Sequence, residues 1–143
     1  MRPIISIFAF VILAACAESG APGTPIEGRW YTAEQVERGR GLYQAHCAVC
    51  HAADGSATSE WRTPGPDGHY PPPPLNGSAH TWHHPLGLLS DTIASGGAQF
   101  GGVMPGFSAV LNEGERLAVI AWFQSLWPDG IYAKWLEIDS RDR

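Results

Sequence analysis

The chain has 143 residues and a formal net charge of −5, a length that accommodates one domain rather than several. Its single lysine, Lys134, and its few arginines argue against binding to nucleic acid, which depends on neutralising phosphates with basic side chains. Seventeen Gly and twelve Pro make up about a fifth of the chain, against roughly 12% in average proteins, and predict long shaped loops between few regular elements.

The amino terminus carries Arg2 followed by an uncharged, largely apolar run over residues 4–13. This run is too short for a membrane-spanning helix, which needs about 20 apolar residues. A short apolar run behind a positive charge is typical of an export signal. Residues 13–16, Leu-Ala-Ala-Cys, resemble the lipobox of bacterial lipoproteins, where the chain is cleaved before the cysteine and the cysteine is acylated. We therefore expect a lipoprotein signal peptide over residues 1–15 and lipidation of Cys16; an ordinary cleaved signal with a chance cysteine is the alternative.

A first helix is predicted just before the two remaining cysteines. Thr32, with Gln35 three residues later, forms a capping-box pattern that marks a helix start. Gly39 and Tyr43 follow at helical spacing and predict about three turns leading to Cys47. A glycine in the middle of a helix costs about 1 kcal/mol relative to alanine. We therefore expect another backbone to approach closely at this position.

The motif that decides the interpretation is Cys47-Ala48-Val49-Cys50-His51. This C-x-x-C-H pattern is typical of c-type haem attachment, in which two thiols add to the haem vinyl groups and the adjacent imidazole reaches the iron. A thioredoxin-like redox motif would lie near a βαβ pattern, and a zinc site would need a second ligand pair; the sequence offers neither. We predict one covalent haem c attached through Cys47 and Cys50, with His51 as an iron ligand.

With this motif, the chain from about Arg29 to Trp127 resembles the class I cytochromes c, the small monohaem electron carriers. The resemblance implies an all-α fold with three main helices and long loops wrapped around one covalently bound haem c. It implies a cytochrome c domain over residues 29–128, followed by a carboxyl-terminal extension over 129–143. The stretch before the domain has several Gly and Pro and few apolar residues, which predicts a flexible tether over 16–28. It also implies that the first and last main helices cross at a glycine, so that Trp122 is expected over Gly39.

Two further helices and a helical tail are predicted in the second half of the chain. An apolar stripe that begins beside Pro85 and ends before Gly96 predicts the middle helix. The last main helix is expected to start at Asn112, to run to Trp127 and to stop at Pro128. Apolar residues cover it almost all round, which predicts burial on several sides. The tail carries Ile131, Trp135 and Ile138 at helical spacing, and we expect it to pack back on the body.

Met104 is the only methionine besides Met1. It lies in Gly101–Phe107, a run that resembles the sulfur-ligand loop of the family. The resemblance implies that Met104 binds the iron opposite His51, which raises the reduction potential.

The chain also offers three histidines in the loop after the prolines: His80, His83 and His84. We favour surface or propionate-side hydrogen bonding for them. The alternative is a copper or zinc site at this cluster, which has acceptable spacing but no carboxylate or thiol support.

The groups around the haem ligands can be predicted only in part. An imidazole ligand usually has its far nitrogen held by an acceptor. Residues Tyr70–Gly77 resemble the proline loop of the family, and the register of that resemblance implies the carbonyl of Pro73 as the acceptor for His51. A rigid polyproline spacer is equally consistent with four consecutive prolines. Trp82 and Arg62 are expected to hold the haem propionates, although unrelated surface residues would give the same pattern.

These features predict an electron carrier rather than an enzyme. We expect a monohaem cytochrome c that cycles between Fe(III) and Fe(II) with His/Met ligation, alone or as a subunit of a respiratory oxidoreductase complex. It would be exported to the periplasmic side, held to a bacterial membrane by its lipid anchor, and docked weakly to basic patches on redox partner proteins. The alternatives are an open-site haem enzyme or gas/redox sensor, and a copper-handling lipoprotein that uses the histidine cluster.

Overall fold

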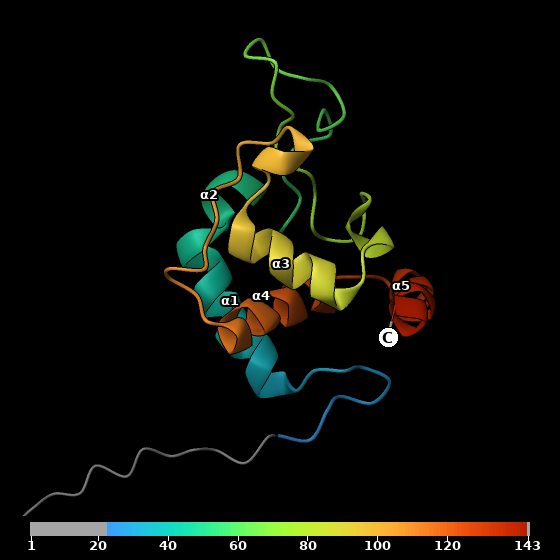
Figure 1. Cartoon of the computed structure of the whole chain (residues 1–143). Helices are drawn as coiled ribbons and strands as arrows, with labels where there is room; N and C mark the ends of the chain where they lie inside the picture. Colours follow the sequence, from blue (N-terminus) through green and yellow to red (C-terminus); the bar gives the residue numbers. More distant parts are fainter. Residues whose placement is uncertain (1–22, 143) are drawn as a thin grey trace, which may run out of the picture.

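A computed structural model describes residues 23–142. The predicted signal peptide and Cys16 lie outside the described residues. Within the described residues the fold is all-α, as predicted, and contains no strand. The α-helices are α1 (Ala33–His46), α2 (Ala48–His51), α3 (Leu86–Ser95), α4 (Glu113–Ser125) and α5 (Asp129–Asp142), and the 3₁₀ turns are η1 (Thr81–His83) and η2 (Ala98–Phe100) (Figure 1).

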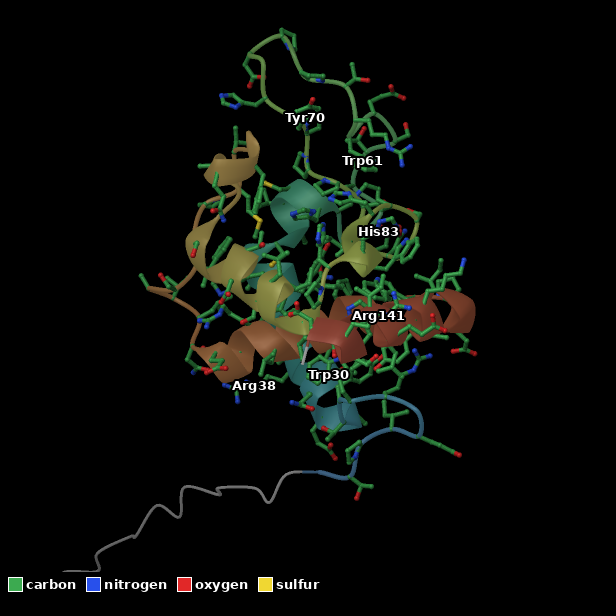
Figure 2. The ribbon with its side chains drawn as sticks, turned by 45° about the vertical axis from the view of Figure 1, so that its right-hand side comes forward. Trp30, Arg38, Trp61, Tyr70, His83 and Arg141 are labelled. Carbon is green, nitrogen blue, oxygen red and sulfur yellow. The ribbon has the colours of Figure 1, made fainter. Side chains whose placement is uncertain are left out.

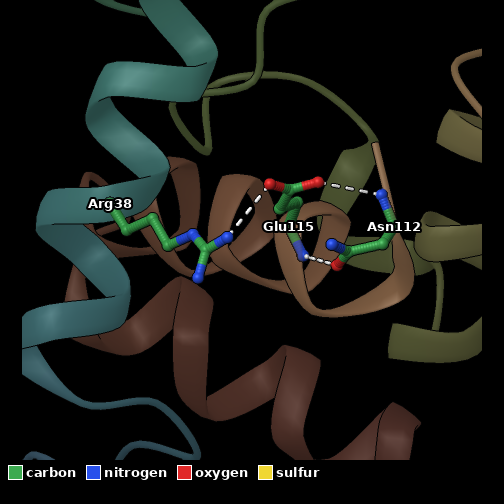
Figure 3. Close-up of polar contacts among 3 residues, drawn as sticks. All are labelled: Arg38, Asn112 and Glu115. Atoms are coloured by element: carbon green, nitrogen blue, oxygen red, sulfur yellow. Dashed lines mark hydrogen bonds and ion pairs between the residues drawn. The ribbon is translucent and has the colours of Figure 1, made fainter. Parts of the chain in front are cut away.

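Capping boxes fix the starts of both long core helices, which confirms the predictions for α1 and α4. The Thr32 hydroxyl accepts from the Gln35 backbone N–H at 3.2 Å, and the Gln35 side chain accepts from the Thr32 N–H at 2.9 Å. At α4, Asn112 and Glu115 make the same reciprocal pair, with both distances 3.0 Å. The Glu115 carboxylate also accepts from Arg38 of α1 at 3.0 Å, so one side chain caps α4 and ties it to α1 (Figure 3).

Helices α1 and α4 cross at Gly39, which confirms the expected close approach (Figure 1). A Cβ atom on Gly39 would lie 1.8 Å from the carbonyl oxygen of Ala118 and 3.0 Å from the Cβ of Trp122. The two backbones therefore touch where a side chain would not fit. Trp122 lies at the crossing and packs its ring against that of Tyr43, with centroids 3.9 Å apart.

Helix α4 ends two residues before the predicted limit. Its last helical residue is Ser125, and the N–H groups of Leu126 and Trp127 bond to carbonyls three residues back, those of Phe123 and Gln124. The final turn tightens because Pro128 has no N–H to continue the helix and disfavours helical geometry in the residue before it.

Helix α3 begins after Pro85 and ends at Gly96, as predicted, and it packs on α4. Helix α5 follows Pro128 and packs back on the body beside η1, which confirms the expectation for the tail. Trp135 of α5 is fully buried, and its indole N–H donates to the carbonyl oxygen of His84 at 2.9 Å. No helix formed by residues 23–142 is long and apolar enough to cross a membrane.

The hydrophobic core lies between α1, α3, α4 and α5 and is rich in aromatic rings. It buries side chains that would together stabilise the fold by the transfer of apolar surface out of water. Its fully or nearly fully buried members are Tyr31, Tyr43, Leu89, Ile93, Leu111, Val119, Ile120, Ala121, Trp122, Phe123, Trp127, Tyr132 and Trp135.

Candidate functional site

The C-x-x-C-H motif lies where α1 passes into the single turn of α2. The N–H of Cys47 still bonds to the carbonyl of Tyr43 at 2.8 Å, and the N–H groups of Cys50 and His51 bond back to the carbonyl of Cys47 at 3.1 and 2.9 Å. One turn therefore carries both thiols and the imidazole, because residues three and four apart share a helix face.

Both thiols of the motif are free rather than joined in a disulfide. Cys47 is partly buried and Cys50 is exposed. Burial, with a smaller contribution from Cys50, raises the pKa of Cys47 to about 11, so this sulfur is a neutral thiol at pH 7. Two reduced neighbouring thiols are the form that addition to haem vinyl groups requires.

His51 is buried, and its Nδ1 atom lies 2.9 Å from the carbonyl oxygen of Pro73. A carbonyl oxygen only accepts, so Nδ1 carries the proton and donates, which leaves the lone pair on Nε2. Burial lowers the pKa of His51 and outweighs the Pro73 hydrogen bond, which acts in the opposite direction, so the ring is neutral. The predicted contact is therefore present, in the tautomer that suits a metal ligand.

Three consecutive carbonyls of the proline loop each accept from a side chain of another element. Pro73 accepts from His51, Pro74 accepts from the Thr81 hydroxyl at 3.2 Å, and Leu75 accepts from the Trp127 indole at 2.8 Å. A bare polyproline spacer would not need these contacts. The loop is thus fixed at the point where it touches His51.

The sequence interpretation missed Tyr43 and Trp127 as supports of the site. The buried Tyr43 hydroxyl donates to the carbonyl of Ala52 at 2.9 Å and lies 3.3 Å from that of His51. Trp127 holds the proline loop through Leu75. The sequence analysis treated both residues only as members of helices. Their residue types could have indicated the contacts, because a buried Tyr or Trp usually bonds its polar atom to a partner.

Met104 lies in the loop after η2 and packs, partly buried, against the core. Its carbonyl accepts from the N–H of Gly97 at 3.0 Å. Gly96 has φ 86°, and a Cβ there would lie 2.6 Å from the Met104 carbonyl oxygen. The glycines that end α3 therefore let the Met104 segment approach the helix end closely.

The two predicted propionate donors, Arg62 and Trp82, each pack against a neighbouring aromatic ring. The Arg62 guanidinium is exposed and lies over the Trp61 ring, 4.5 Å from its centroid. The Trp82 ring packs on His83, with centroids 3.8 Å apart, and Lys134 of α5 lies 5.8 Å from the Trp82 ring. Figure 2 shows Trp61 and His83 on the side of the molecule above α5.

The three loop histidines do not form the copper site that was one alternative. His80 stacks on Trp61, His84 meets His80 edge-on, and His83 packs on Trp82. The rings of His80 and His84 contact each other, whereas that of His83 packs on Trp82 instead. In the part of the chain that the structure describes, no three His, Cys, Asp or Glu side chains are grouped to hold a metal ion.

The donor set at the motif is two thiols, one neutral imidazole with a free Nε2, and a thioether loop packed on the same core. This chemistry fits a c-type haem and not a bare metal ion. A family model described as "Cytochrome C oxidase, cbb3-type, subunit III" matches residues 34–123. The chain belongs to this cytochrome c family. Comparisons with curated proteins and with solved structures found no match.

As a class I monohaem cytochrome c, the protein binds haem c covalently and functions in haem-based electron transfer. The matched range begins in α1 and ends in α4, so it contains the C-x-x-C-H motif, the proline loop and Met104.

Proposed function

We propose that this cytochrome c is an electron carrier in which His51 and Met104 are the two axial ligands. The observation that carries the proposal is the buried His51 with Nδ1 on the Pro73 carbonyl, because a structural histidine on a surface turn would need no such acceptor. When bound, the haem supplies a one-electron Fe(III)/Fe(II) couple.

The roles of the side chains follow from their chemistry. Cys47 and Cys50 fix the cofactor by thioether bonds. His51 offers Nε2, and its Nδ1–H donation to Pro73 makes the ring a better donor to a metal. Met104 offers a soft, neutral sulfur, and the apolar packing around it disfavours water as a competing ligand. A site closed in this way carries electrons and does not process a substrate.

We also propose a domain plan of tether 16–28, cytochrome c domain 29–128 and carboxyl-terminal extension 129–143, with acylated Cys16 anchoring the protein on the periplasmic side of a membrane. The sequence pattern at residues 13–16 supports the anchor, and the family description, an oxidase subunit, is consistent with work at a respiratory membrane. The net charge of −5 favours partners with basic docking patches.

The mass of the membrane-extracted protein tests the proposed lipid anchor. A chain that begins at an acylated Cys16 supports the anchor, and an unacylated chain contradicts it.

The Met104→Ala substitution tests the proposed ligand set. The haem should stay attached through Cys47 and Cys50, but the reduction potential should fall by a large margin, because loss of the thioether removes the ligand that favours Fe(II). Spectroelectrochemical titration of the variant against the unsubstituted protein measures this. An unchanged potential would mean that Met104 is not an axial ligand.

A further inference from the structure

One buried ring nitrogen beside the proline loop lacks a hydrogen-bond partner within the described chain, the Nδ1 atom of His80. Its ring stacks on Trp61 with centroids 4.6 Å apart and planes at 20°, and His84 packs edge-on against it at 5.3 Å. The next residue, Thr81, bonds to the Pro74 carbonyl. The imidazole is therefore held in place, and a buried polar atom that is held without a partner destabilises the fold.

The groups that act electrostatically on the His80 ring are two histidines and one arginine, and none of them is a carboxylate. The charged or titratable groups that act on it are His84 and His83 from η1 and its end, and Arg62 from the loop that carries Trp61. Burial has the largest effect on the pKa of His80, and each of these neighbours lowers it further. Lys134 reaches the same side of the molecule from α5, over the Trp82 ring. In a chain of net charge −5, this cluster of donors matches an anionic acceptor.

The haem of this family brings such acceptors, because it carries two carboxylates. The chain distance is short: Pro73 contacts His51, and Pro74, the next residue, holds Thr81, the neighbour of His80. We propose that His80 donates from Nδ1 to a haem propionate, and that the Trp61 ring positions it for this bond. The proposal depends on the proposed function only in that the haem is attached at Cys47 and Cys50. It narrows the surface or propionate-side role expected for the three loop histidines to one nitrogen atom, beside the propionate role expected for Arg62 and Trp82.

In this arrangement Arg62 contacts Trp61 and not the proposed propionate. Its exposed guanidinium lies on the Trp61 ring, so it adds positive potential to the stack without itself being buried. Trp82 packs on His83 and Lys134 instead. The one nitrogen in this cluster that is both buried and without a partner belongs to His80, among the residues that the structure describes.

The test compares His80→Phe with His83→Phe in the haem-loaded protein. Phenylalanine keeps a flat ring on Trp61 but removes Nδ1, and His83 is a matched control because it is exposed and lies in the same turn. The readouts are the reduction potential as a function of pH across the histidine range and the NMR titration of the His80 ring in the ferric and ferrous forms.

Reduction adds one negative charge at the haem and so favours the protonated imidazole, which raises the pKa of His80 in the ferrous form. The potential of the unsubstituted protein should therefore fall as the pH rises through the His80 pKa. His80→Phe should abolish this dependence and lower the potential, because the propionate loses a donor. His83→Phe should keep the pH dependence, displaced only to the higher pH that follows from losing the effect of His83 on the His80 pKa.

Three results would overturn the proposal. One is a His80→Phe profile that matches the unsubstituted protein. Another is a His80 titration that is identical in both oxidation states, which would assign Nδ1 to water. The third is a profile that moves with added inorganic phosphate, which would assign the site to a free anion. Loss of Met104 ligation in the same sample would contradict the proposed function alone, because these readouts need only attached haem.

Discussion

At the scale of single residues, the exit of the chain from the haem motif depends on Tyr43. Ala52, directly after His51, has φ 62° and ψ 158°, a region that residues other than glycine rarely occupy and that costs about 1–3 kcal/mol. The Tyr43 hydroxyl donates to the Ala52 carbonyl at 2.9 Å and also lies 3.3 Å from the carbonyl of His51. The buried tyrosine thus holds the turn that directs the chain away from His51.

Tyr43→Phe should therefore lower the free energy of unfolding by about 1–3 kcal/mol, because the substitution leaves the Ala52 carbonyl without its donor. Urea unfolding of the haem-loaded protein, followed by tryptophan fluorescence, measures the change. Tyr70→Phe is the matched control, since Tyr70 is 47% exposed and surface substitutions usually change stability by less than about 0.5 kcal/mol. Equal effects of the two substitutions would refute the role given to Tyr43.

At the scale of elements, the arrangement depends on the crossing of α1 and α4. Helix α1 carries the haem motif at its end, and α4 leads through Trp127 to the proline loop. The crossing at Gly39 therefore sets the distance between the haem motif at the end of α1 and the proline loop that Trp127 holds. The exposed ion pair between Arg38 and Glu115 adds little to stability by itself. Its carboxylate, however, is the same group that caps α4 (Figure 3).

Two glycines of α1 provide a matched test of this crossing. Gly39→Ala should lower the free energy of unfolding by more than about 3 kcal/mol or prevent haem incorporation, because the new methyl group would lie 1.8 Å from the Ala118 carbonyl oxygen. Gly41→Ala places its added Cβ where nothing lies within 4 Å. This substitution should raise the free energy of unfolding by about 1 kcal/mol, because alanine has the higher helix propensity.

Thermal unfolding and the yield of haem-loaded protein measure both variants. Because each substitution adds the same methyl group to the same helix, a similar effect of the two would show that the crossing does not depend on the absence of a side chain at Gly39.

The elements that the sequence predicted well are those whose signals are local. Thr32 and Asn112 are followed by their capping partners three residues on, and Pro85 and Gly96 bracket α3, so these boundaries could be located without knowledge of the fold. The end of α4 was placed two residues too late, because Pro128 tightens the turn before it as well as stopping the helix.

At the scale of the whole molecule, the site could be predicted where covalent chemistry sets the spacing and where a loop resembles that of the family, as at Pro73. The C-x-x-C-H motif fixes three residues within one turn, so the haem and its proximal side follow from sequence. The loop over residues 52–70 has no periodicity, so nothing in the sequence placed Trp61 on His80 or turned Arg62 outward. Long-range contacts of this kind depend on how α5 and the loops pack, and local sequence patterns do not determine that packing.

The central claim is that His51 and Met104 close both axial positions of one haem c. The most direct measurement is the optical spectrum of the ferric protein, produced in a host that matures c-type haem, in the near-infrared region of the weak sulfur-to-iron charge-transfer band. The proposed function predicts that this band is present at neutral pH with a low-spin spectrum and disappears in Met104→Ala. A high-spin spectrum without the band would contradict it and would indicate an open iron site suited to an enzyme or a gas sensor.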